Sequence, residues 1–245
     1  GIIRESVTVG ASGREYNAAT QSFDYLTGEY ETVTHNNMYG TLENQYTEGS
    51  SFNKIYVEPD DFESLGLDPS AADANGYVLL KVGMYSTCVN IDGKGSIDGF
   101  GTVTQSITTG MSRRIDDSGQ WMMTGSYSTI SNNDKYGALV DQLTKGESYN
   151  RIYIGTALTQ AELSTIGVNG GAYDSTTGYA LLTVGMYSTY ANIKVNGVIL
   201  GIVDEFGTVR ETITYGESRR VDENKNWMMT GNYTTTSVNN IYGYL

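Results

Sequence analysis

Two short segments carry the most specific charged pattern in the sequence. Each contains a serine, two arginines and, after one further residue, an aspartate: Ser112-Arg-Arg-Ile-Asp116 and Ser218-Arg-Arg-Val-Asp222. Adjacent arginines on a strand point to opposite faces, and each guanidinium can hold a carboxylate through two parallel hydrogen bonds. Because the chain is acidic, pairing with a carboxylate of the protein itself is favoured over pairing with a ligand. Arg113 and Arg219 nevertheless remain candidate ligand-binding residues.

Repeated aromatic residues form the second candidate set. Trp121 and Tyr127 lie in a stretch that returns almost unchanged with Trp227 and Tyr233. Core and cross-strand packing is the first interpretation of such residues. Alternatively, exposed rings beside Asn and Thr would stack on sugar rings, while the polar groups bond sugar hydroxyls. The four aromatic residues are therefore candidate carbohydrate contacts.

The remaining reactive residues show no catalytic pattern. His35 is the single histidine, so the usual partners for a zinc site or an activated nucleophile are missing. No Gly-x-Ser-x-Gly nucleophile elbow is present. Neighbouring acids such as Asp60-Asp61, Asp116-Asp117 and Asp204-Glu205 are expected to be solvated in turns rather than paired for glycoside hydrolysis. The chain is predicted not to be an enzyme.

One segment has some features of a calcium loop. Residues 90–98 place Asp and Gly near one another, as a tight turn around a hard cation requires. The closing bidentate Glu is missing, however, and the counterpart that begins at Asn192 has no acids. A two-residue Asp-Gly or Asn-Gly hairpin turn explains both segments. No cofactor is predicted, and calcium is kept as the alternative.

Composition predicts a mainly β protein. The chain has 245 residues with 30 Gly, 20 Tyr and only 2 Pro, which favours pleated strands joined by tight turns. This length can bury a sizeable core in one domain or two. Cys88 is alone, so no intrachain disulfide forms, and a buried or half-buried packing role is expected.

Charge and hydropathy exclude several partners. A net charge of −13 opposes binding to nucleic acids and to anionic membranes, because such binding needs clustered Lys and Arg. No run of 18 apolar residues occurs, so no transmembrane segment is predicted. Gly1 in place of Met indicates a tag remnant or a processed leader.

Long-range repetition is the strongest architectural signal. Matching residues lie 97 positions apart for Tyr30 and Tyr127, and 106 apart for Trp121 and Trp227, so the period is about 100 residues. Residues 50–145 and 146–245 form two full repeats, and residues 1–49 resemble the second half of one. The surplus half-repeat is expected to pair with a later module or with a neighbouring subunit.

Within each repeat, local signals predict hairpins. The alternating strand at 102–109 is followed by turn residues and then by the Trp121 strand. Asn-rich segments that end in Tyr-Gly predict a turn and a returning strand at Tyr39, Tyr136 and Tyr242.

Two further signals lie in the first half of each full repeat. The segment that begins at Tyr179 is too long for one regular strand, so Gly185 and Gly83 are expected to mark bends or bulges. Residues 59–66 and 159–167 have the start and stop signals of a short helix. The predicted fold is therefore all-β, with internally repeated antiparallel sandwich- or barrel-like modules, two and a half copies and at most one short helix per full repeat.

These observations predict a non-catalytic extracellular or cell-surface protein with a structural or adhesive role. It would self-assemble by β-strand complementation, as a subunit of a fibre, layer or adhesin. The alternative is a multivalent, lectin-like carbohydrate-binding module that uses the aromatic and arginine residues named above.

Overall fold

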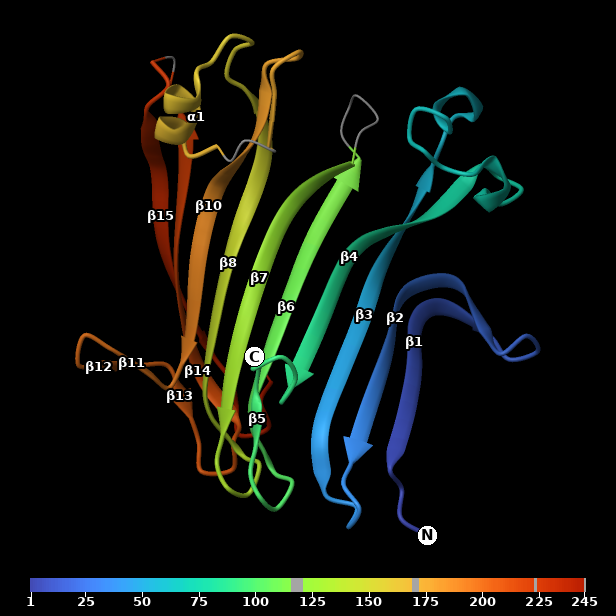
Figure 1. Ribbon diagram of the computed structural model, residues 1–245, viewed down its shortest axis with the longest axis vertical. Coiled ribbons are helices and arrows are strands. Elements are labelled where there is room, and N and C mark those ends of the chain that lie inside the picture. Colours follow the sequence, from blue (N-terminus) through green and yellow to red (C-terminus); the bar gives the residue numbers. More distant parts are fainter. Residues whose placement is uncertain (116–120, 169–171, 223, 245) are drawn as a thin grey trace. The chain divides into compact units, whose positions relative to one another are not determined.

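A computed structural model describes residues 1–115, 121–168, 172–222 and 224–244 of the chain (Figure 1). Over these residues the protein is all-β, built on large antiparallel sheet structure with one short α-helix, as predicted. The chain divides into two compact units. Unit 1 comprises Gly1–Trp121 and Asn132–Gly137, and unit 2 comprises Met122–Ser131 and Ala138–Leu245.

Unit 1 is built on one antiparallel sheet with the strand order β1-β2-β3-β4-β6. The short β5 pairs with the start of β6. Two 3-10 helices lie in the connection from β3 to β4. The bounds are β1 (Glu5–Asn17), β2 (Ser22–Asn36), β3 (Leu42–Tyr56), η1 (Pro59–Asp61), η2 (Pro69–Ala71), β4 (Tyr77–Val89), β5 (Ser96–Ile97) and β6 (Val103–Ile115).

Unit 2 is built on an antiparallel sheet with the strand order β7-β8-β10-β14, and β15 pairs with the other side of β14. β9 pairs with β10, β13 pairs with β14, and β11 and β12 form a two-stranded ribbon. The bounds are β7 (Trp121–Asn133), β8 (Leu139–Tyr153), α1 (Gln160–Ile166), β9 (Tyr173–Asp174), β10 (Tyr179–Ala191), β11 (Ile193–Val195), β12 (Val198–Leu200), β13 (Ile202–Val203), β14 (Val209–Val221) and β15 (Trp227–Val238).

The predicted bulges in the long strands are confirmed. The register of β10 against β8 shifts between Thr183 and Gly185. In β4 the corresponding shift, opposite Ser51 and Phe52, comes immediately before Gly83. Both strands are 13 residues long, and an extra residue in one strand of a pair bends that strand and increases its twist.

Helix α1 forms where the sequence signals place it. Thr159 is the N-cap, and a capping box links its side chain to the backbone of Glu162 and the Glu162 side chain to the backbone of Thr159. Gly167 ends the helix in the left-handed conformation with a φ of 78°, which costs glycine little. In the first copy, the signals at 59–66 produce only the 3-10 helix η1.

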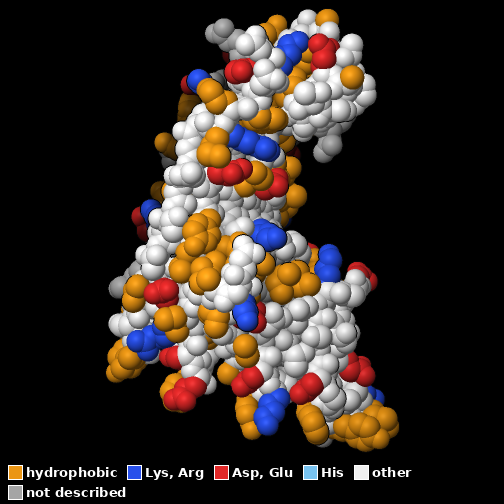
Figure 2. All heavy atoms as spheres, turned by 90° about the vertical axis from the view of Figure 1, so that its left-hand side faces the viewer, with side chains coloured by type: hydrophobic (Ala, Val, Ile, Leu, Met, Phe, Trp, Pro, Cys, Tyr) orange, Lys and Arg blue, Asp and Glu red, His pale blue; other side chains and the backbone are white. Residues whose placement is uncertain are grey.

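The buried cores lie at one end of the strands. In unit 1, Val57, Phe62, Val78 and Leu80 form a cluster between the strand ends and the β3–β4 connection. In unit 2, Leu163 and Ile166 of α1 pack against neighbours that include Leu182. Elsewhere many apolar side chains are exposed, and Figure 2 shows them interspersed with acidic and basic groups.

The finer fold prediction is not confirmed. The strands described for each unit lie in one sheet, with the β11–β12 ribbon beside the sheet of unit 2. The sandwich- or barrel-like packing and the period of the repeat therefore stay predictions, as do the domain boundaries at residues 49 and 145. No helix in the described part of the chain has the length and apolar character needed to span a bilayer.

Candidate functional site

The arginine and tryptophan predicted to bind ligands in unit 2 form an internal contact. The guanidinium of Arg219 lies over the ring of Trp227, 4.3 Å from its centroid, and its Nε donates to the carbonyl of Thr183 at 3.0 Å. The indole Nε1 of Trp227 donates to the carbonyl of Ile166, the last residue of α1, at 2.6 Å. Trp227 thus holds the helix on the sheet.

Unit 1 contains the same pair. The guanidinium of Arg113 lies 4.1 Å from the ring centroid of Trp121, and its Nε donates to the carbonyl of Lys81 at 2.9 Å. Trp121 packs against the unit 1 core cluster. The sequence analysis predicted that each arginine pairs with a carboxylate of the protein. In the structure, each guanidinium instead contacts an indole ring and a backbone carbonyl. Asp116, one candidate partner, lies outside the described residues.

The predicted tyrosines belong to a regular row on one face of the sheets. Tyr233 of β15 lies opposite Gly216 of β14, and a Cβ on that glycine would overlap the tyrosine ring. Tyr127 lies within β7. Three further tyrosines cover a glycine of the preceding strand in the same way: Tyr30 over Gly10, Tyr85 over Gly49 and Tyr187 over Gly146.

A row of threonines lies beside the tyrosine row. On each strand that carries a row tyrosine, the threonine comes two residues after the tyrosine. The hydroxyls of Thr32 and Thr47 are 2.8 Å apart, and those of Thr87 and Thr108 are also 2.8 Å apart. In unit 2 the corresponding distances are 2.9 Å for Thr129 with Thr144 and 2.8 Å for Thr189 with Thr214. Thr pairs directly opposite one another stabilise neighbouring strands.

These rows define two kinds of strand. In one kind, Thr, Gly and Ser follow at alternate positions, as in Thr47, Gly49 and Ser51 of β3; we call it a TGS strand. In the other, Gly, Tyr and Thr do so, as in Gly28, Tyr30 and Thr32 of β2; we call it a GYT strand. In the strand pairs β1–β2, β2–β3, β3–β4, β4–β6, β8–β10, β10–β14 and β14–β15, the register places Tyr opposite Gly, Thr opposite Thr and Ser opposite Gly. The TGS strands are β1, β3, β6, β8 and β14, and the GYT strands are β2, β4, β7, β10 and β15.

Two long strands, β1 and β15, lie at sheet edges. Within the described residues, β1 pairs only with β2, and β15 pairs only with β14. Every residue of both edge strands is exposed or half-buried, and Val9 of β1 is 72% exposed. Edge strands of this length present unpaired backbone N–H and C=O groups to solvent.

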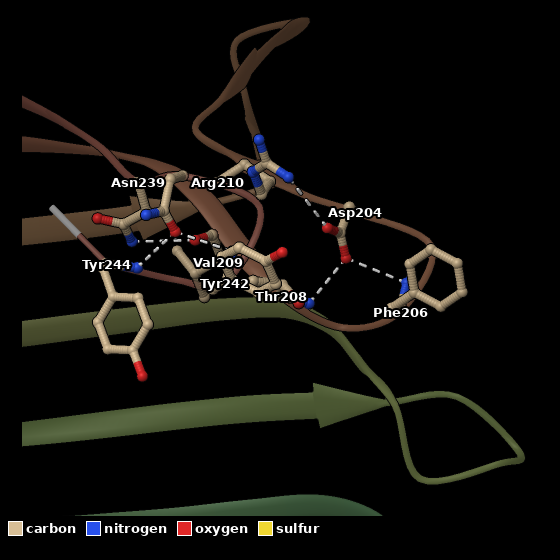
Figure 3. A network of polar contacts seen from close by, with 9 residues as sticks. Asp204, Phe206, Thr208, Val209, Arg210, Asn239, Tyr242 and Tyr244 are labelled. Carbon is tan, nitrogen blue, oxygen red and sulfur yellow. Dashed lines mark hydrogen bonds and ion pairs between the residues drawn. The ribbon is translucent and has the colours of Figure 1, made fainter.

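A second feature is a set of matching turns at the ends of the strands opposite the cores. Asp204 accepts hydrogen bonds from the backbone N–H of Phe206 and Thr208 at 3.0 and 2.9 Å, and an ion pair of 3.6 Å joins it to Arg210 (Figure 3). Asn239 holds the neighbouring strand end by donating to the carbonyl of Val209 at 2.9 Å. The same acceptor role falls to Asn37, Asp98, Asp134 and Asn240.

Each of these turns presents one aromatic ring to solvent. The aromatic residues are between 75% and 91% exposed, and the following glycine has a positive φ between 79° and 87°. The aromatic residues are Tyr39, Phe100, Tyr136, Phe206 and Tyr242. The sequence-level prediction of turns at the three tyrosines is confirmed, whereas the shared pattern Asp/Asn-x-Tyr/Phe-Gly, which also includes the two phenylalanines, was the signal that could have revealed the set.

The turns of one unit lie side by side. In unit 1, Gly101 packs against Thr41 and Leu42, which follow the first turn, and Gly137 lies 3.6 Å, measured from a built Cβ, from Thr102. In unit 2, Gly243 has the same relation to Thr208. In unit 1 each turn joins two strands about 4.8 Å apart, so successive aromatic residues there recur at about 10 Å.

His35, Cys88 and the acidic residues are the candidate reactive groups of the chain. No cluster of three or more His, Cys, Asp or Glu suited to a metal occurs among the residues described. His35 pairs with Glu5 at 3.4 Å on an exposed surface, and Cys88 is buried as expected. At 90–98, Ile91 and Lys94 form a hairpin bridge around Asp92 and Gly93, which is the Asp-Gly hairpin turn expected there.

One shallow groove crosses strands β1 to β4 of unit 1. Its lining includes Glu29, Glu48, Lys81 and Met84, and neither a histidine nor a cysteine is among the described residues that line it. Two of its carboxylates, Glu31 of β2 and Glu48 of β3, lie directly opposite one another in the strand register. The hydroxyl of Tyr46 donates to the Glu48 carboxylate at 3.1 Å.

Comparison with known proteins assigns no family. No protein-family model and no curated protein matches the chain. A protein of unknown function from Bacteroides fragilis NCTC 9343 aligns with 10% identity and a TM-score of 0.23, covering 86% of this chain and 94% of the other. A porin-like protein from Bacteroides uniformis ATCC 8492 aligns with 10% identity and a TM-score of 0.16, covering 95% of each. TM-scores this low do not establish a shared fold.

Proposed function

We propose that the protein is a non-catalytic structural or adhesive component of an extracellular or cell-surface assembly, and that it self-associates through its edge strands. The observation that supports this most directly is the pair of long, solvent-exposed edges, β1 and β15. Proteins that stay monomeric usually protect such edges with charged residues, prolines or short strands.

The composition of the two edges strengthens the proposal. β15 contains no charged residue and no proline, and residues 6–13 of β1 contain neither as well. The equal strand lengths and matching bulges of β4 and β10 are consistent with modules that repeat about every 100 residues, in two and a half copies, as the proposed assembly unit.

Sizing by light scattering over a range of protein concentrations, together with electron microscopy, tests the proposal. Wild-type protein is expected to form species larger than a monomer, with abundance that rises with concentration. The Val7→Lys/Val9→Lys variant places charges on β1 and should shift the distribution to monomer. Val198→Lys/Ile199→Lys is the matched control, since both residues are 61% exposed and lie on the β11–β12 ribbon. A wild-type protein that stays monomeric at every concentration would refute self-association.

A second candidate function is multivalent carbohydrate binding, and the exposed aromatic turns are the observation that favours it. Rings exposed at a regular spacing of about 10 Å could each stack on one sugar of a polymer. Trp121 and Trp227 are less suited to this role, because their rings contact arginines and core residues.

Binding to polysaccharides, measured by pull-down and by glycan array, would test this candidate. Replacing Tyr39, Phe100 and Tyr136 together with alanine should abolish binding by unit 1. Replacing Tyr16, which is 58% exposed and meets Phe23 edge-on in the β1–β2 hairpin, is the control. Absence of any glycan bound by wild-type protein removes this candidate.

A further inference from the structure

The two edge strands of the chain are of complementary kinds. β1 is a TGS strand, with Thr8, Gly10 and Ser12 at alternate positions, and GYT strand β2 is its one partner among the residues described. β15 is a GYT strand, with Gly231, Tyr233 and Thr235, and TGS strand β14 is its partner. The two kinds of strand alternate in the sheets. A GYT strand such as β15 would therefore continue the alternation at the free side of β1, and a TGS strand such as β1 would continue it at the free side of β15.

Strands inside the sheets show what that next neighbour looks like. The TGS strand β3 has GYT strands on both sides, with Gly49 opposite Tyr30 and Tyr85. The TGS strand β14 is flanked in the same way, with Gly216 opposite Tyr187 and Tyr233. The free side of β1 therefore corresponds to a position that a GYT strand occupies elsewhere.

From this complementarity we propose that β15 of one copy pairs antiparallel with β1 of a second copy, with Tyr233 opposite Gly10 and Thr235 opposite Thr8. The inference rests on the proposed self-association and specifies its partner, orientation and register. The contact is heterologous, because two different edges meet, so each added copy leaves one free edge of each kind.

The threonine hydroxyl bonds support the same order of strands. Each of the four bonds in the threonine row joins a GYT strand to the TGS strand that follows it in the sheet: β2 to β3, β4 to β6, β7 to β8 and β10 to β14. Thr8 precedes the first of these bonds and Thr235 follows the last, and both threonines are exposed. The proposed joint would make the next bond of the series.

The direction in which the tyrosine rings lie is also compatible with the joint. Tyr85 covers Gly49 on the preceding strand, whereas Tyr30, on the other side of Gly49, covers Gly10 instead. At the joint, Gly10 would be covered by Tyr30 of its own copy, and Tyr233 would keep its place over Gly216. No ring has to move for the edges to meet.

Disulfide trapping between separately purified variants, each with one introduced cysteine besides the buried Cys88, tests the register. Thr8→Cys mixed with Thr235→Cys should give a mixed disulfide dimer under mild oxidation, and Val7→Cys mixed with Thr236→Cys should do so on the opposite face. Val7→Cys mixed with Thr235→Cys should crosslink at least tenfold less, because the two side chains would point to opposite faces. Wild-type protein, in which Cys88 is buried, sets the background.

Each other outcome overturns the inference in a recognisable way. Thr8→Cys dimers formed without the partner variant would show pairing of β1 with β1, and the corresponding result for Thr235→Cys would show pairing of β15 with β15. A Thr8→Cys/Thr235→Cys chain that crosslinks only within itself would show that the two edges meet in one molecule. If wild-type protein assembles but the in-register pairs do not crosslink, the register is wrong while self-association stands; a strictly monomeric wild type refutes both.

Discussion

At the scale of single residues, contacts between unlike side chains fix the strand register. A glycine opposite each tyrosine leaves room for the ring to lie across the neighbouring strand. A glycine inside a strand weakens it, but an aromatic ring that covers the glycine shields its backbone and compensates. A slip by one residue would move every tyrosine to the other face.

Gly146 offers a direct test of this contact. A Cβ at Gly146 would overlap the Tyr187 ring, so Gly146→Ala should lower the free energy of unfolding by about 1–3 kcal/mol. In a Tyr187→Ala background the overlap is gone, and the same substitution should be neutral or stabilising by roughly 0.5 kcal/mol. Urea unfolding of the four proteins gives the coupling; an additive cycle would contradict the contact.

Asp98 allows a pH-dependent test of the aromatic turns. Backbone N–H groups, first that of Thr102 and then that of Phe100, hold the pKa of this carboxyl below its ordinary value of 3.8. The carboxylate thus stabilises the fold above that ordinary value, and this contribution is lost as the pH falls through the lower folded pKa. Asp98→Asn keeps an acceptor, as Asn37 does in its own turn.

Thermal unfolding should therefore show Asp98→Asn melting slightly below wild type at pH 7, with the gap closing as the pH falls below 3.8. Asp98→Ala, which has no acceptor, should melt lowest at neutral pH. A gap between wild type and Asp98→Asn that stays constant through the acid range would show that the carboxylate has no special role in the turn.

At the scale of elements, the short helix of unit 2 depends on its cap. Thr159 accepts from the backbone N–H of Glu162 and takes part in the capping box, so Thr159→Ala should cost about 1 kcal/mol. Thr165→Ala lies in the same helix, removes only a bond to the Ala161 carbonyl and should be neutral within about 0.5 kcal/mol. Hydrogen exchange of the helix amides should accelerate in the first variant only; equal acceleration in both would contradict the capping role.

Elements with local signals were predictable, and those without were not. The capping box around Thr159, the bulge at Gly185 and the Asn-Gly or Asp-Gly hairpins follow from the residues at those positions alone. The Arg219–Trp227 contact joins side chains eight residues apart across a hairpin, and its link to Ile166 spans 61 positions. Nothing local in the sequence specifies that the arginine stacks on a ring instead of pairing with a carboxylate.

For the candidate sites, the sequence identified repeated residues but not where the fold places them. Repetition in the sequence identified Trp121, Tyr127, Trp227 and Tyr233 as one set. The structure shows that the two tryptophans pack against the core clusters, whereas Tyr233 belongs to the tyrosine row. The sequence analysis did not identify the five exposed aromatic residues as one set. The turns that contain Phe100 and Phe206 lie in the first half of each full repeat, whereas those that contain a tyrosine lie in the second half. A search for the turn pattern itself would have joined them.

At the scale of the whole molecule, net charge opposes the proposed association. Copies that each carry a formal charge of −13 repel one another, while the central parts of the two edges are uncharged. Raising the salt concentration from about 10 mM to 150 mM shortens the screening length from about 30 Å to about 8 Å. Light scattering should therefore show larger species at the higher salt concentration, and smaller species there would contradict pairing through uncharged edges.

The difference between the two edges has a consequence for any polymer built on them. One tip of the polymer would always end in the GYT strand β15 and the other in the TGS strand β1. The polymer would therefore be polar, with two chemically different ends. A synthetic peptide with the sequence of residues 227–238 would then stop elongation at one tip and leave the other active.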